Sequence, residues 1–304
     1  MSRPRSVPFT FLLAFTLTLT HLAHADANST GIAADRFSPG IGPLTLFGGE
    51  AAEVTPFAQL SWVVSLSLQR DPLKLSTQLG GEVIARPVHD QLVSDVGLEA
   101  GFWKRFAIGL GVPAVLYADG DRLRGTSADD APLATTAGGD LRMRLKAAFI
   151  GDPARQGMHV AVLVQVTVPR GGQSQFAATD GVTFEPRLLA DFRYGRFLFC
   201  AALGVRFAPE RTLFETTFGD ELTWLGGASL ALVERGRFSG GLVAEFAGAV
   251  GPSDGTRPAE FRGGLRAALG ALAVDVGAGA GLVGDAGAPS WRLFAVLRHS
   301  FHLY

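Results

Sequence analysis

Charged side chains recur at every second position of the stretch 139–150, GDLRMRLKAAFI. The even positions carry the charges Asp140, Arg142, Arg144 and Lys146. The odd positions carry the apolar residues Leu141, Met143, Leu145, Ala147 and Phe149. Successive side chains of a β-strand point to opposite faces, so this spacing predicts a strand with one charged face and one apolar face. Such charges can select a passing ion, or they can pair with charges on neighbouring strands and fill an enclosed space.

Other groups with chemical potential have unsuitable surroundings. The stretch 279–284, GAGLVG, matches a dinucleotide-binding glycine pattern, but no helix is expected after it. His299 and Ser300 could belong to a lipid hydrolase, but adjacent strand residues face opposite sides. The acidic residues of the connection 118–139 are interleaved with arginines and lack a calcium-loop pattern, which favours a solvated loop. We therefore expect no catalytic site, no cofactor and no metal.

Composition and the N-terminus indicate where the 304-residue chain resides. Residues 1–25 combine Arg3 and Arg5, an apolar stretch and the small-residue site Ala23-His24-Ala25, which predicts a cleaved signal peptide. The net charge of −1 gives no field that would attract nucleic acid. Cys200 is the single cysteine, so no intramolecular disulfide can form. The mature chain is therefore expected outside the cytoplasm.

Period-two alternation of apolar and polar residues continues from residue 57 to the C-terminus. Twelve strands are predicted at 57–70, 91–102, 105–117, 139–150, 158–169, 182–193, 196–207, 221–233, 237–249, 259–269, 272–282 and 291–304. Short and long connections alternate between them, which is typical of an antiparallel up-and-down barrel with both termini at the short-turn side.

A soluble β-sandwich would show the same alternation, but two features favour a membrane barrel. The polar faces are sparse, small and mixed in sign, which suits an enclosed lumen better than an open surface. In a bilayer every backbone group must be paired internally, so a sheet has to close on itself. The fold class predicted is all-β, an antiparallel up-and-down transmembrane β-barrel of about 12 strands. It spans 56–304, after a partly disordered periplasmic lead-in segment at 26–55.

The charged faces of the strands supply the candidate site. The lumen-lining candidates are Glu99, Arg142, Arg144, Lys146, Glu185, Arg187, Asp191, Arg206, Glu245, Arg262 and Arg266. They can form a selectivity lining that favours anions, or a salt-bridged filling of the barrel. We expect the cations of 139–150 to pair with Glu99, Glu185 and Asp191. The sequence favours a structural barrel or narrow pore. A solute or anion channel is the first alternative, and an outer-membrane lipid-modifying enzyme is the second.

Three segments resemble the barrel half of OmpA-like outer-membrane proteins of Gram-negative bacteria. They are GDLRMRLKAAFIG (139–151), VTVPRGGQSQFAATDGVTFEPRLLADFRYGRFLFCAALGVRF (166–207) and FGDELTWLGGASLAL (218–232). The resemblance implies contact with outer-membrane lipid and delivery by the barrel-insertion machinery, which the terminal Tyr304 fits and His302 does not. The peptidoglycan-binding domain typical of these proteins is not expected, because the chain ends at the last strand. Any solute and the oligomeric state stay open.

Overall fold

The computed structural model describes residues 31–76, 83–121, 136–151, 156–171, 176–213, 216–251, 256–283 and 286–303. The predicted signal peptide and Tyr304 lie outside these ranges, as does most of the acidic connection after β3. Within them, no helix is long and apolar enough to cross a membrane.

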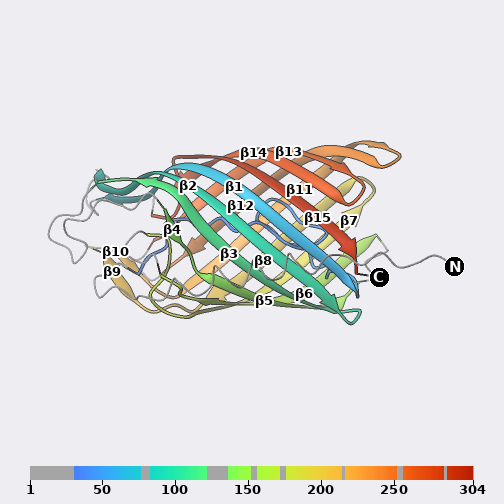
Figure 1. The fold of residues 1–304 in the computed structure, drawn as a ribbon, viewed down its shortest axis with the longest axis horizontal. Coiled ribbons are helices and arrows are strands. Elements are labelled where there is room, and N and C mark those ends of the chain that lie inside the picture. The colour runs from blue at the N-terminus through green and yellow to red at the C-terminus, as the bar shows by residue number, and fades with distance from the viewer. Residues whose placement is uncertain are drawn as a thin grey trace, which may run out of the picture.

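Twelve long antiparallel strands form a closed, tilted barrel (Figure 1). They are β1 (Gln59–Ser76), β2 (Val83–Phe102), β3 (Phe106–Asp119), β5 (Leu141–Ile150), β6 (Gly157–Val168), β7 (Thr183–Tyr194), β8 (Phe197–Arg206), β11 (Glu221–Arg235), β12 (Phe238–Val250), β13 (Ala259–Leu269), β14 (Leu272–Val283) and β15 (Trp291–His302). Each pairs with its sequence neighbours, and the pairing of β1 with β15 closes the ring. The predicted fold class is confirmed.

The main departure in the strands is at the β1–β2 hairpin. The sequence pattern placed a long connection at 71–90, but β1 continues to Ser76 and β2 starts at Val83. Register shifts follow Arg70, and Asp71 has a positive φ of 50°. A bulge shifts the facing of every residue after it, so the period-two pattern is lost where the strands continue. Three further short strands were not predicted: β4 (Ala137–Gly138), and β9 (Arg211–Leu213) and β10 (Thr216–Phe218), which pair as a hairpin.

Side chains alternate between the outside and the interior as the charge pattern predicts. On β5, Leu145 is 45% exposed on the outer face, whereas Arg144 beside it is only 4% exposed. Met143 and Phe149 share the outer face, and Arg142 and Lys146 are buried. The outer surface of the barrel is therefore an apolar band, and the charges lie within.

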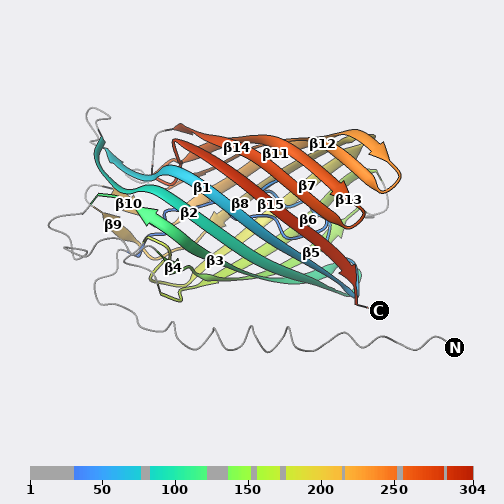
Figure 2. The ribbon, with the colours of Figure 1, turned by 45° about the horizontal axis from the view of Figure 1, so that its top comes forward.

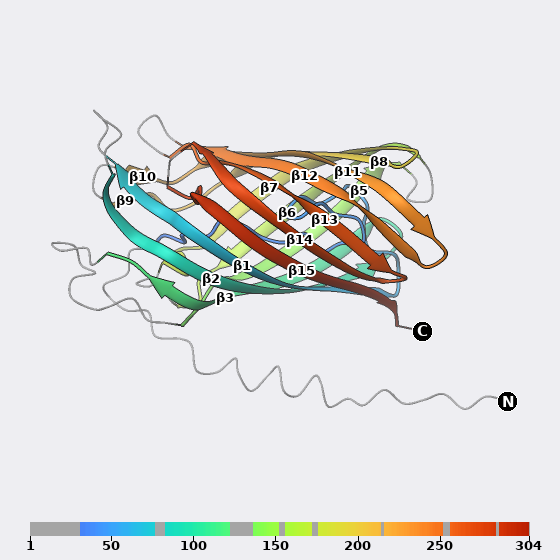
Figure 3. The same cartoon turned by 90° about the horizontal axis from the view of Figure 1, so that it is seen from above.

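Residues 31–56, here called the luminal segment, lie inside the barrel (Figures 2 and 3). The segment starts at the end of the barrel that carries the long connections, where the Ala34 amide donates to the Phe176 carbonyl at 2.9 Å. It leaves at the short-turn end, where Phe57 forms a bridge with Gly101. A Cβ at Gly101 would lie 2.1 Å from the carbonyl oxygens of Thr55 and Pro56, so only glycine admits this close passage.

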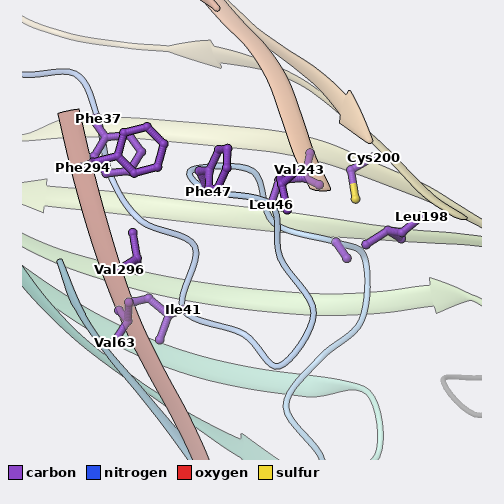
Figure 4. Close-up of a cluster of buried hydrophobic side chains, with 11 residues drawn as sticks. Phe37, Ile41, Leu46, Phe47, Val63, Leu198, Cys200, Val243, Phe294 and Val296 are labelled. Carbon is purple, nitrogen blue, oxygen red and sulfur yellow. The ribbon is translucent and has the colours of Figure 1, made fainter. Parts of the chain in front are cut away.

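The barrel core is built between the luminal segment and the wall (Figure 4). Phe37 and Phe47 pack on Phe294 of β15, with ring centroids 5.5 and 4.7 Å away. Leu46 and Phe47 are fully buried. The periplasmic lead-in expected for 26–55 is therefore wrong from residue 31 onward: this apolar and polar stretch fills the lumen.

Candidate functional site in the lumen

The charges of β5 meet the luminal segment at Glu50. Its carboxylate lies 2.6 Å from Nη1 of Arg144 and 2.7 Å from Nζ of Lys146. Burying the Glu50 carboxylate is costly, and the two cations beside it offset that cost. Arg144 also donates to the hydroxyl of Ser38 and to Oε1 of Gln165. One acid of the segment thus neutralises two wall cations.

Wall residues of β12 to β15 bind the segment through its backbone. Glu245 accepts hydrogen bonds from the amides of Gly48 and Gly49, each at 3.1 Å, and pairs with Arg262. Arg266 and Arg298 both pair with Asp275, and they donate to backbone carbonyls of the segment. Those carbonyls belong to Gly40, Thr45, Leu46 and Phe47. The irregular backbone, which has few partners of its own, is satisfied by charged side chains of the wall.

At the short-turn end, Asp191 of β7 contacts both the luminal segment and His159 of β6. It accepts a hydrogen bond from the Ala52 amide at 2.8 Å, and its other oxygen lies 2.8 Å from Nδ1 of His159. Glu53 lies 3.0 Å from Arg193, yet burial raises the pKa of Glu53 above its ordinary value despite that cation. The hydroxyl of Thr55 donates to Glu99. The segment is therefore held here by both backbone and side chains.

At the long-loop end, a chain of ion pairs joins the segment to β7, β8 and β11. Arg187 lies 2.8 Å from Glu185, and Arg206 lies 3.3 Å from Glu185 and 3.2 Å from Glu221. Arg36 of the segment completes the chain with two 2.8 Å hydrogen bonds to Glu221. Three guanidinium groups thus share two carboxylates.

All eleven lumen-lining candidates lie inside the barrel, but their partners differ from the expected ones. Of the three predicted acidic partners of β5, only Glu99 lies near a β5 cation, 3.8 Å from Lys146. Glu185 pairs with arginines of β7 and β8, and Asp191 with His159 and Arg193. Further charged residues at the site were not among the candidates: Asp35, Arg36, Glu50, Glu53, Asp95, Arg292 and Arg298.

These seven charged residues were not among the candidates for two different reasons. Asp95, Arg292 and Arg298 lie on the polar phase of their strands, so the alternation alone could have included them. The charges of the luminal segment carry no periodic signal, because the segment is neither strand nor helix.

In the part of the chain that the structure describes, two cavities lie beside the luminal segment. The mid-barrel cavity, of about 100 Å³, lies between the segment and β6 to β13. The long-loop cavity, of about 170 Å³, opens toward the long connections. Both are lined by Arg36, Ser38, Arg187 and Arg206. The ion-pair chain at the long-loop end therefore lies where the two cavities meet.

The residues considered for lipid hydrolysis do not come together. His299 stacks on Trp62 at the outer surface, with ring centroids 5.9 Å apart. The hydroxyl of Ser300 points inward and lies 2.8 Å from the hydroxyl of Ser61. Among the residues that the structure describes, no group of three or more His, Cys, Asp or Glu could hold a metal ion.

Comparison with known proteins shows the fold and nothing finer. No family model matches the chain, and no curated protein matches its sequence. An outer membrane channel from Pseudomonas putida F1 has a similar structure, with a TM-score of 0.58 and 12% identity over 82% of this chain and 98% of that one. The β domain of the Bordetella autotransporter BrkA scores 0.47 with 17% identity, covering 80% and 100%. LpxR from Salmonella typhimurium scores 0.45 with 10% identity, covering 79% and 99%. The chain has the fold of an outer-membrane β-barrel.

Proposed function

We propose that the protein is an outer-membrane barrel of low resting conductance, closed by its own luminal segment. The observation that supports this most strongly is the bonding of that segment to the wall along its length. It contacts β7 at the short-turn end, β5 and β12 to β15 in the middle, and β11 at the long-loop end. A chain bonded at so many points stays in place, and the two cavities described beside it have volumes of about 100 and 170 Å³.

The outer surface supports the proposed membrane location. Large apolar side chains cover the strands, among them Ile108, Leu145, Leu188, Leu203 and Leu265, each at least 45% exposed. A soluble monomer rarely exposes so continuous an apolar surface. The interacting rings of Phe102, Trp103 and Phe106 at the β2–β3 turn fit an interfacial aromatic girdle. We extend the resemblance to OmpA-like proteins only to the barrel. On that basis we propose outer-membrane lipid and the barrel-insertion machinery as its partners.

Conductance in planar bilayers tests the closure. We expect the unmodified protein to give small or no current. Glu50→Gln removes the charge that neutralises Arg144 and Lys146, so those cations are left to repel one another, and openings should become more frequent. Glu234→Gln, at the exposed β11–β12 turn, is the control and should behave as the unmodified protein. A large, steady current from the unmodified barrel would contradict the proposed closure.

An anion-preferring pore is the second candidate, because arginines line both cavities where they meet. If Glu50→Gln conducts, its reversal potential in a salt gradient should show anion preference. A cation-preferring current would rule out this candidate and leave the closure unaffected. We propose no catalytic role.

A further inference from the structure

Three arginines that line the long-loop cavity are more exposed than the carboxylates with which they pair. The Arg187 and Arg206 side chains are 24% and 26% exposed, whereas their shared partner Glu185 is 1% exposed. The Arg36 side chain is 19% exposed and its partner Glu221 is 4% exposed. In each of these pairs the cation is the more exposed partner. The guanidinium groups are therefore more accessible than the acids that neutralise them.

Two buried hydrogen-bond donors on the same cavity lack a partner. Nε of Arg142 and Nε2 of Gln91 are both buried and donate to no acceptor within the protein, although Arg142 pairs with Asp95 through Nη2. Leaving a buried donor unpaired costs about 1–3 kcal/mol, so such groups usually have a partner. A small turn of either side chain toward the cavity would offer its N–H to the oxygen of an anion.

The remainder of the lining is apolar and partly acidic. Phe37, Phe176, Val93 and Val115 are buried and face the cavity. Four carboxylates of the described residues line it as well. They are Asp35, which pairs with Arg292; Asp140, whose Oδ2 is bonded to Thr179 and whose Oδ1 has no partner; Asp180, which pairs with Arg211; and Glu221, which pairs with Arg36. A single water needs about 10–15 Å³ on the same volume scale, so 170 Å³ admits a small organic molecule.

We propose that the long-loop cavity binds a small organic acid, with its carboxylate against the arginines and its apolar body against Phe37 and Phe176. This site goes beyond the proposed closure of the barrel and does not require an open pore. The ligand would enter from the end that carries the long connections, where the exposed side chain of Arg211 lines the cavity.

Calorimetric titration of the folded full-length protein in detergent tests the site with three probes. Benzoate carries both features, benzamide is its neutral counterpart, and inorganic phosphate is an anion without an apolar body. We expect saturable binding of benzoate at one site, and binding of benzamide and phosphate at least about tenfold weaker. Equal binding of benzamide would overturn the role of charge, and equal binding of phosphate would overturn the organic class. Absence of benzoate binding would overturn the site itself.

The matched variants are Arg187→Gln and Arg266→Gln. Arg187 lines the cavity, and its removal leaves Glu185 paired with Arg206. Arg266 is about as exposed, does not line the cavity, and its removal leaves Asp275 paired with Arg298. Loss of one charge-assisted hydrogen bond should weaken benzoate binding about tenfold in Arg187→Gln only. Equal losses in both variants would refute the location.

A second variant guards against misfolding. Arg211→Gln, at the exposed rim, should also weaken benzoate binding, and heat-dependent gel mobility reports whether each variant is folded. Since these measurements do not depend on current, a conducting barrel that still binds benzoate would refute the closure and leave this site standing. A barrel that gives no current and does not bind benzoate would refute this site and leave the proposed closure standing.

Discussion

At the scale of single residues, the cost of a charged side chain depends on whether it points to the lipid or into the lumen. Leu145 is in the middle of β5 with its side chain on the apolar outer face. An arginine there costs about 2–4 kcal/mol at the bilayer midplane and about 0–1 kcal/mol near an interface. Leu145→Arg should therefore lower the yield of folded barrel in lipid vesicles. Leu269→Arg, next to the β13–β14 turn, is the depth control and should fold nearly as well. Equal yields would show that the two positions do not differ in depth.

Asp140, just before β5, should make stability depend on pH. Burial raises its pKa to about 6 from an ordinary 3.8, although the Thr179 amide and hydroxyl donate to it. The folded protein binds this proton more tightly than the unfolded chain does. The stabilising contribution of the protonated form is therefore complete below about pH 4 and is lost as the pH rises through 6. The shift corresponds to at most about 3 kcal/mol.

Asp140→Asn keeps an oxygen acceptor for Thr179 and removes the charge. Its free energy of unfolding in urea should exceed that of the unmodified protein at pH 7.5 and approach it at pH 4. The substitution is the same at both pH values, so any pH-independent effect of replacing the carboxylate by an amide cancels in the comparison. A difference that stays constant across this range would show that Asp140 titrates normally.

At the scale of elements, the strands could be predicted and the luminal segment could not. β5 to β8 follow the alternation closely, because each contacts the apolar outside on one face and the polar interior on the other. The bulged ends of β1 and β2 break that rule, so the sequence pattern predicts a loop where the strands continue. The luminal segment has no periodicity, and its partners lie as many as 258 residues away in the chain. Local pattern carries no information about such contacts.

The turn of the luminal segment at Gly49 should tolerate no side chain. A Cβ there would lie 2.5 Å from Leu225 of β11, so Gly49→Val should displace the turn and weaken the amide bonds to Glu245. We expect faster hydrogen exchange at residues 44–52, while the strands keep their protection. Gly226→Val is the control, because a Cβ at that position meets nothing within 4 Å. Unchanged exchange in Gly49→Val would mean that Leu225 yields instead.

At the scale of the whole molecule, the closed sheet with an apolar outside predicts the location. Cell fractionation should recover the protein with the outer membrane, and unheated samples should migrate differently from boiled ones on a gel. The reason is that a ring with all its strands paired, including β1 with β15, resists detergent until it is heated. Recovery as a soluble periplasmic monomer would contradict the proposed location.

The position of the luminal segment also bears on how the ring is assembled. The last pairing joins β1 to β15, whose partners Gln59 and His302 are at opposite ends of the barrel sequence. The segment immediately precedes β1, and it already holds β15 through Asp35 on Arg292 and through backbone carbonyls on Arg298. Once it docks, the two strands of the seam are tethered close together, and the chain entropy lost on closure falls because the free loop is short. We therefore expect the residues that fill the finished barrel to bring its first and last strands together during assembly.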